Sequence, residues 1–162
     1  KQNKRFIEQN LNRCFLTKQS KVVRNSLEGK TAKEIMNYLN ISDAMLDLHS
    51  SNTKNSKPFI ICEKQSFDVA LALPAKIITC NWDKFEPGST DYYMNLQNKI
   101  GICLECGYIN DEKSIKISEK AVNSFLKVFG LIDGQVKQNK KQYCKIVSIY
   151  KNKFGKFKKM KF

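Results

Sequence analysis

The segment from Ala44 to Ser51 constrains the fold most strongly, because an apolar run there ends abruptly in polar and ionisable residues. It reads Ala-Met-Leu-Asp-Leu-His-Ser-Ser. A short apolar run closed by polar residues is typical of a buried strand in a parallel sheet. In open α/β sheets, ligands bind just beyond the carboxyl ends of the strands. The segment therefore places His49, the only histidine of the chain, where such a fold holds its chemistry.

Short apolar runs alternate with helical patterns over residues 30–130. One helix is predicted from Thr31, with Glu34 completing a capping box. The clearest amphipathic helix opens at Ser114 or Ser118 and ends at Gly130. The other predicted elements are strands at 58–62, 77–80, 100–107 and 143–150, and short helices near 67–73 and 92–96. This alternation predicts an α/β fold with a mainly parallel sheet.

The overall charge does not by itself identify a partner. The net charge is +14, from 29 basic and 15 acidic residues, but the lysines are scattered and only three arginines are present. Arginine binds phosphate better than lysine does, because its guanidinium offers paired N–H donors. With so few arginines, a solvated basic surface is the favoured interpretation outside the tail from Lys137 to Phe162. No run approaches the length of a transmembrane helix, so no membrane partner is expected.

Six cysteines raise the question of disulfides or a zinc cluster. Cys103 and Cys106 have C-x-x-C spacing, but they lie in a predicted strand. Side chains three positions apart on a strand point to opposite faces, so these two thiols are not expected to share a metal. We expect both to be core residues, in a chain that works in the reducing cytoplasm.

Two of the predicted strands end in residues that could carry chemistry, His49 and Glu105. A carboxylate in the apolar segment around Glu105 is costly unless it is paired, metal-bound or protonated, although a salt bridge at the sheet rim explains it equally well. Taken alone, His49 is more often a hydrogen-bonded core histidine than a ligand. Asn12 and Arg13 alone indicate only a surface loop.

Together, however, these residues resemble the succinylglutamate desuccinylase/aspartoacylase family of zinc carboxypeptidase-like hydrolases. Residues 10–15 (Asn-Leu-Asn-Arg-Cys-Phe) resemble its (D/N)-L-N-R-x-F segment, and residues 47–49 (Asp-Leu-His) resemble its D-L-H. Residues 104–107 (Leu-Glu-Cys-Gly) resemble its (L/I)-E-x-G. Residues 88–93 (Gly-Ser-Thr-Asp-Tyr-Tyr) are similar to a segment that precedes this glutamate in carboxypeptidase-like relatives. The resemblance extends over residues 4–132.

The resemblance implies a three-layer, zinc-carboxypeptidase-like fold with a mixed, mainly parallel sheet flanked by helices. It implies that His49 binds zinc, that Glu105 is the general base and acid, and that Asn12 and Arg13 hold the substrate. The implied activity is zinc-dependent hydrolysis of the amide bond of an N-acyl amino acid or a similar small carboxylate substrate. Such a zinc keeps one position open for water, a carboxylate transfers the proton, and an arginine fork binds a carboxylate.

Two departures from the family pattern limit this prediction. The G-x-H-G-x-E segment that carries the first two zinc ligands is absent, so the chain as given cannot form a His₂Glu site. We expect a fragment, with a partial catalytic domain at 1–134 and the start of a β-rich segment at 135–162; the alternative is an inactive, small-molecule-binding relative. Residues 92–96 also lack the second substrate arginine of aspartoacylases, so binding of a second carboxylate is not expected.

The Lys-rich tail supports one further alternative. Lysines alternate with aromatic residues over 153–162, and such a pattern can bind phosphates and stack on bases. An edge strand guarded by lysines explains the same pattern at least as well. A small-molecule substrate is therefore favoured over nucleic acid or an anionic surface.

Overall fold

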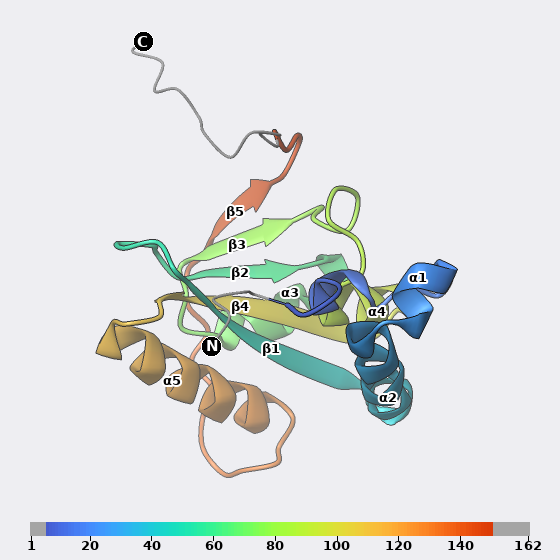
Figure 1. Cartoon of the computed structure of the whole chain (residues 1–162). Helices are drawn as coiled ribbons and strands as arrows, with labels where there is room; N and C mark the ends of the chain where they lie inside the picture. The colour runs from blue at the N-terminus through green and yellow to red at the C-terminus, as the bar shows by residue number, and fades with distance from the viewer. Residues whose placement is uncertain (1–5, 151–162) are drawn as a thin grey trace.

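The computed structural model describes residues 6–150, which form a five-stranded sheet between two layers of helices (Figure 1). The strands are Ala44–Ser51 (β1), Phe59–Cys62 (β2), Ile77–Cys80 (β3), Ile100–Tyr108 (β4) and Gln142–Lys145 (β5). They lie in the order β1-β4-β2-β3-β5. Only the β2–β4 pair is antiparallel among these neighbours. The predicted α/β fold with a mixed, mainly parallel sheet is confirmed.

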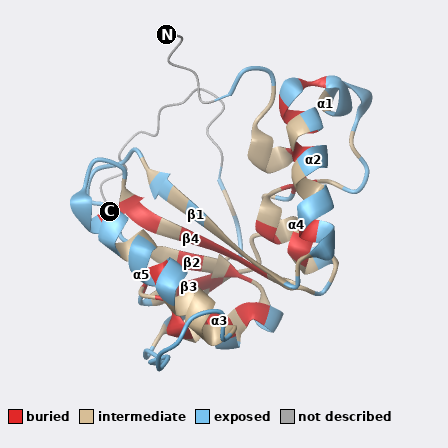
Figure 2. Cartoon of the chain, turned by 90° about the horizontal axis from the view of Figure 1, so that it is seen from below, coloured by how far each residue is buried: buried red, intermediate tan, exposed pale blue. Residues whose placement is uncertain are grey.

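Helices cover both faces of this sheet (Figure 2). The helical elements are Leu11–Arg13 (η1, a 3-10 turn), Lys21–Asn25 (α1), Leu27–Ile41 (α2), Lys64–Ser66 (η2), Phe67–Ala72 (α3), Thr90–Leu96 (α4) and Glu112–Val128 (α5). Helices α3 and α5 pack on one face, and α1, α2 and α4 lie on the other side. The layers predicted from the family resemblance are therefore present.

Each face of the sheet has its own hydrophobic core. Ile102 and Leu104 of β4 are fully buried beneath α5, whose apolar residues Ile117, Ala121 and Phe125 repeat at helical spacing and face the sheet. The second core lies between the sheet and α2, and it includes Cys14, Phe15, Ala32, Leu39 and Met94.

Gly101 allows α4 to lie directly against β4. A Cβ atom at this position would lie 2.6 Å from the backbone oxygen of Asp91 and 2.8 Å from Met94 Cβ, which is closer than real Cβ contacts. A residue without a side chain is therefore required at this close approach. As a result, Thr90 and Asp91 in the first turn of α4 lie over the sheet.

Two helices begin earlier than predicted. Helix α2 starts at Leu27, because the Ser26 side chain caps it by accepting from Gly29 N at 3.0 Å; Thr31 lies inside the helix and donates to Leu27 O instead. Helix α5 starts at Glu112, since Asp111 accepts from Lys113 N at 2.9 Å. In both cases the chain offers several capping residues within one turn.

Two strand predictions also need correction. The strand β1 is confirmed but lies at an edge of the described sheet and is half-buried, because β4 is its only paired neighbour among residues 6–150. The strand predicted at 143–150 is shorter, spanning Gln142–Lys145, and it pairs with β3.

The Lys-rich segment 153–162 lies outside the described residues. Within 6–150, no helix combines the length and apolar character that crossing a bilayer requires.

Candidate active site

Four side chains of β1 and β4 form a compact patch on one face of the sheet. The parallel register pairs Asp47 with Cys103 and His49 with Glu105. Side chains alternate between the two faces of a strand, so these four share the face that α4 approaches. Leu46, Ile102 and Leu104, which point to the other face of these strands, pack in the opposite core beneath α5. The site therefore arises from two strand segments and their register.

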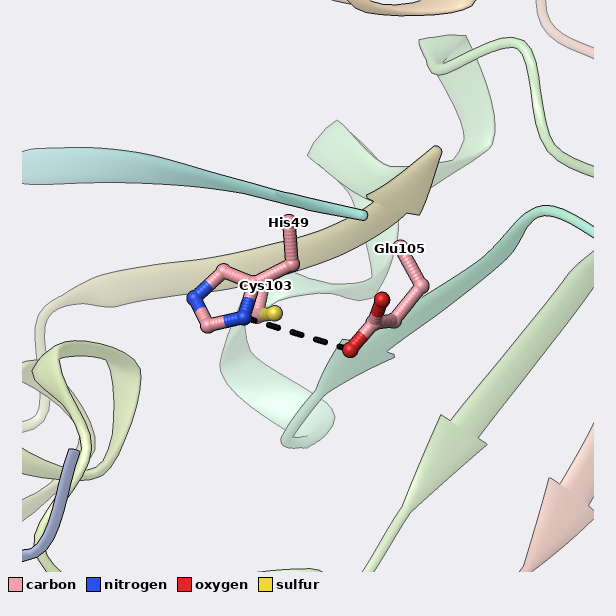
Figure 3. Close-up of side chains that lie close together, drawn as sticks. All are labelled: His49, Cys103 and Glu105. Atoms are coloured by element: carbon pink, nitrogen blue, oxygen red, sulfur yellow. Dashed lines mark ion pairs between the residues drawn. The ribbon is translucent and has the colours of Figure 1, made fainter. Parts of the chain in front are cut away.

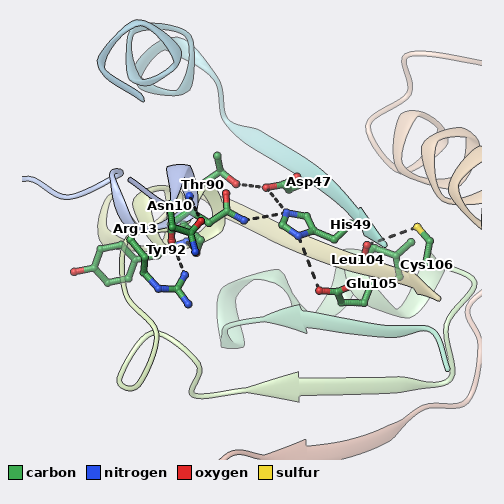
Figure 4. A network of polar contacts seen from close by, with 11 residues as sticks. Asn10, Arg13, Asp47, His49, Thr90, Tyr92, Leu104, Glu105 and Cys106 are labelled. Atoms are coloured by element: carbon green, nitrogen blue, oxygen red, sulfur yellow. Dashed lines mark hydrogen bonds and ion pairs between the residues drawn. The ribbon is translucent and has the colours of Figure 1, made fainter. Parts of the chain in front are cut away.

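The imidazole of His49 is held on one side by two polar contacts to its Nε2 atom (Figure 4). Its Nε2 atom lies 3.2 Å from Asp47 Oδ2 and 3.3 Å from Asn12 Nδ2. Thr90 Oγ1 in turn donates to Asp47 Oδ2 at 2.5 Å. The other ring nitrogen, Nδ1, faces Glu105 Oε1 at 3.9 Å. The Asp47 contact thus orients the ring so that Nδ1 points into the site.

The same contacts shift the ionisation of both residues. The hydrogen bond to Asp47 raises the pKa of His49, and the charges of Asp47, Glu105 and Asp91 add to this effect against the opposing effect of burial. Burial alone would raise the pKa of Asp47, but the hydrogen bonds from His49 and Thr90 and the charge of His49 lower it overall. Asp47 is therefore ionised. Its carboxylate can accept a hydrogen bond from His49 both when the imidazole is neutral and binds a metal and when the imidazole is protonated.

Arg13 enters the site from the η1 turn. Asn10 caps this turn by accepting from Asn12 N at 3.2 Å, and Arg13 Nη1 donates to Asn12 O at 2.5 Å. Arg13 Nη2 forms an ion pair with Glu86, which lies in the loop between β3 and α4. Phe15 N also donates to Gly88 O in that loop at 3.0 Å. The loop therefore fixes the guanidinium at the edge of the site.

These elements enclose a pocket of about 170 Å³. The structure brings together all four residues predicted from the sequence, because Asn12, Arg13, His49 and Glu105 all line it. Its remaining lining residues are Phe59, Ile61, Trp82, Glu86, Ser89, Asp91 and Cys103. Burial raises the pKa of Asp91, which is only 4% exposed. The pocket therefore combines carboxylates, one guanidinium and one imidazole with the apolar side chains of Phe59, Ile61 and Trp82.

Cys103 was predicted to be a core residue, but it also lines this pocket. One ligand atom each from His49, Cys103 and Glu105 lies within 4.8 Å of the other two (Figure 3). Imidazole, thiolate and carboxylate donors suit a borderline cation such as zinc. As predicted, Cys106 lies on the opposite face, in the core with Ala121, so the two thiols of the C-x-x-C pair do not meet.

The sequence held a signal for only part of what was missed. The two-residue period of β4 places Cys103 on the same face as Glu105, so its position was predictable once that strand was assigned. Asp91 lies in the segment similar to carboxypeptidase-like relatives. Glu86 had no local signal, because it meets Arg13 across 73 positions of the chain.

Known structures with the same fold are similar to this chain over most of its length. The product-bound ectoine utilization protein EutE (DoeB) of Ruegeria pomeroyi aligns with a TM-score of 0.71 and 19% identity over 86% of this chain and 45% of its own. Succinylglutamate desuccinylase of Vibrio cholerae aligns with a TM-score of 0.66 and 17% identity over 89% and 47%.

An aspartoacylase family protein of Mesorhizobium loti aligns with a TM-score of 0.59 and 25% identity over 85% of this chain and 43% of its own. The chain thus spans less than half the length of these three structures. No curated protein sequence matches the chain. The model of the succinylglutamate desuccinylase/aspartoacylase catalytic domain matches residues 1–129. The chain therefore belongs to the succinylglutamate desuccinylase/aspartoacylase family.

Proposed function

We propose that this chain carries part of the active site of a zinc-dependent hydrolase that cleaves the amide bond of an N-acyl amino acid or a similar small carboxylate substrate. The observation that carries the proposal is the pairing of His49 and Glu105 at the carboxyl ends of β1 and β4, in one pocket with Asn12 and Arg13. Membership of a family of desuccinylases and aspartoacylases supports a deacylase-type reaction.

In this proposal His49 binds zinc through Nδ1. Its Nε2 atom is occupied by Asp47, so the lone pair of Nδ1 is directed towards the pocket and the imidazole is kept in the tautomer that a metal requires. Thr90 holds Asp47 in place through a 2.5 Å hydrogen bond. When bound, zinc supplies the acidity of a coordinated water and polarises the scissile carbonyl.

Glu105 is proposed to accept the proton of the attacking water and to pass it to the leaving amine. Its carboxylate lies 3.9 Å from His49 Nδ1. A water bound to a metal on Nδ1 would therefore be within reach of the carboxylate. The side chain is 24% exposed, so water reaches it from the pocket. Phe59 lies beside Glu105 in the antiparallel register and lines the same pocket, so it supplies an apolar wall next to the carboxylate.

Arg13 and Asn12 are proposed to hold a carboxylate of the substrate. A guanidinium has five N–H donors, so Arg13 can keep its ion pair with Glu86 and still present donors to a ligand. Asn12 lies between Arg13 and His49, which places a substrate contact next to the reacting centre. The pocket residues include no second arginine, which argues against a dicarboxylate held at both ends.

The chain contains one histidine and therefore supplies one ligand of a His₂Glu zinc set. We propose that the working enzyme is a longer polypeptide whose other two ligands precede residue 1, with 1–134 as part of the catalytic domain and 135–162 as the start of a further segment. The rival proposal is a binding relative that carries no zinc. The two differ in metal content.

Metal analysis of the full-length protein tests this choice. We expect one zinc per chain after purification without added chelator, and loss of that zinc in the His49→Ala variant. Asn95→Ala is a suitable control, because Asn95 lies on α4 but does not line the pocket. A folded protein without stoichiometric zinc, and without hydrolysis of any N-acyl amino acid, would leave the binding relative as the better assignment.

A further inference from the structure

We propose that Phe59, Ile61 and Trp82 form an apolar subsite that binds an aliphatic or aromatic group of the substrate. The inference rests on the proposed function and adds a substrate class to it. That class is N-acyl amino acids that carry an apolar group, either in the acyl part or in the amino acid side chain. Acidic compounds such as N-acetylaspartate are then poor substrates.

The sheet divides the pocket into a polar half and an apolar half. The strands β1, β4, β2 and β3 lie side by side in this order (Figure 1). The proposed reacting residues His49 and Glu105 lie on β1 and β4. The apolar subsite lies over the next two strands, with Phe59 and Ile61 on β2 and Trp82 just after the end of β3. A substrate at the reacting residues therefore lies next to apolar surface.

Strand β2 presents its apolar side chains to the pocket. Phe59 lies beside Glu105 in the antiparallel register, so the two side chains share one face of the sheet. Burial alternates along the strand: Phe59 and Ile61 are only partly buried, whereas Ile60 and Cys62 are fully buried in the core beneath α5. Apolar surface left open inside a pocket favours a ligand group that removes it from water.

Trp82 is held so that it offers a ring surface and no hydrogen-bond donor. Its Nε1 donates to Thr79 Oγ1 at 2.9 Å, and that hydroxyl donates to Ile60 O at 2.8 Å. The preceding Asn81 has a left-handed backbone (φ 71°), and its backbone N donates to Glu63 Oε1 at 2.7 Å. The indole is therefore fixed before a ligand arrives, and its N–H is already used within the protein.

The charges in the pocket disfavour an acidic group at the apolar subsite. Arg13 is the one arginine or lysine among the residues that line the pocket, and it forms an ion pair with Glu86. Asp91 and Glu105 add further carboxyl groups to the lining. A second substrate carboxylate would lose its water here without gaining a cationic partner, whereas an apolar group has no such penalty.

A panel of four compounds tests this preference in the zinc-loaded, full-length protein. N-acetylphenylalanine carries the apolar group on the amino acid, N-benzoylglycine carries it on the acyl part, and N-acetylglycine lacks it. We expect kcat/KM for at least one aromatic compound to exceed that for N-acetylglycine by about tenfold or more, and that for N-acetylaspartate by about 100-fold. The better of the two aromatic compounds shows which part of the substrate occupies the apolar subsite.

Substitutions in the apolar subsite should change the ratio between substrates. Trp82→Ala should lower kcat/KM for the better aromatic compound about tenfold and change that for N-acetylglycine less than about twofold. General damage to the reaction would lower both alike. Ile61→Val and Ile60→Val form a matched pair, because each shortens one isoleucine of β2, the first in the pocket and the second in the core. Only Ile61→Val should lower the ratio, by about twofold to fourfold.

Trp82 also gives a binding readout that does not require turnover, because it is the only tryptophan of the chain. Titration with 3-phenylpropionate, an aromatic monocarboxylate without an amide bond, should change the tryptophan emission in a saturable way. Succinate at the same concentrations should not. Trp82→Phe is the control, and the change in emission should be absent from it.

The outcomes separate this inference from the proposed function. A preference for N-acetylaspartate would overturn the apolar subsite and leave the hydrolase standing. Equal losses for the aromatic compound and N-acetylglycine in Trp82→Ala would also overturn it, since the indole would then support the fold and not the substrate. If none of the four compounds is hydrolysed, the proposed function falls. A saturable response to 3-phenylpropionate would in that case still support an apolar binding site, and no response would overturn it as well.

Discussion

The two faces of the β1–β4 pair differ in what their side chains do, although the same two strands, of eight and nine residues, supply the side chains of both faces. On one face, Leu46, Ile102 and Leu104 pack beneath α5 in a continuous apolar core. On the other, the chain places acids, an imidazole and a thiol around a pocket. Successive residues therefore alternate between stabilising the fold and forming the site.

This contrast shows how a small domain separates stability from chemistry. Burial of apolar side chains on the α5 face stabilises the sheet, whereas burial of polar groups on the pocket face costs free energy that hydrogen bonds only partly recover. Asp91 is one such buried polar group, and its pKa is raised by burial. Asp47 and His49 are others, and they recover part of the cost through the contacts between them and with Thr90. Substitutions on the α5 face should therefore lower stability and leave function nearly unchanged, whereas substitutions on the pocket face should lower function and leave stability nearly unchanged.

The largest effect is expected for Glu105→Gln. The amide cannot accept a proton, so turnover by the proposed hydrolase should fall about 10³-fold or more, while zinc content and thermal stability stay close to those of the unsubstituted protein. Steady-state kinetics with an N-acyl amino acid and metal analysis provide the measurement. Retention of most of the activity in a folded, zinc-loaded variant would remove Glu105 from the reaction.

Leu104→Ala, one residue earlier on β4, should have the reverse signature. Leu104 is fully buried under α5, so its truncation leaves a cavity and should lower the free energy of unfolding by about 3 kcal/mol. Urea denaturation measures this, and activity per folded molecule should change little. A loss below about 1 kcal/mol would mean that the α5 face is loosely packed, and the contrast between the faces would weaken.

Asp47→Asn tests the orientation of the imidazole. The carboxylate holds His49 Nε2, and an amide in its place removes the charge that makes Nδ1 a better ligand. We expect zinc affinity to fall about 10- to 100-fold, as measured by competition with a chelator. Thr90→Val removes only the hydrogen bond to Asp47 and should have a smaller effect in the same direction. Equal affinities for all three proteins would contradict this role.

The sequence predicted most of the sheet and most of the site, for a common physical reason. Short apolar runs bounded by polar residues and turn residues mark β1, β2, β3 and β4, and the chemistry lies where two of these strands end. Local patterns were enough because period and position within a strand determine which face a side chain occupies.

The errors occurred where several residues could serve equally well or where contacts are distant. Ser26 and Asp111 cap helices that other nearby serines or threonines could have capped, and which one wins depends on packing of the first turn. The ion pair of Arg13 with Glu86 depends on how the loop after β3 folds over η1. No periodicity in the sequence encodes that contact.

Asp83 gives the smallest and most pH-dependent test of the contrast. It lies on the loop that leads to Glu86 and accepts from Asn95 Nδ2 of α4 at 2.9 Å. Burial raises its pKa to about 6, with Asp91 and Glu63 adding to the effect and the Asn95 hydrogen bond opposing it. The unfolded chain has the ordinary aspartate pKa of about 3.9, so the folded state binds this proton more tightly. The resulting stabilisation is present below pH 4 and is lost as the pH rises through 6.

Asp83→Asn should therefore raise the free energy of unfolding by about 1 kcal/mol at pH 8, after allowance for partial solvent screening, and change it little at pH 4. The Asn side chain can still accept the hydrogen bond from Asn95, so the substitution isolates the charge. Urea denaturation across this pH range is the measurement. A variant that is less stable than the unsubstituted protein at pH 8 would show that the loop needs the charge. In that case, polar burial near the pocket would not weaken the fold, and the two faces would differ less than proposed.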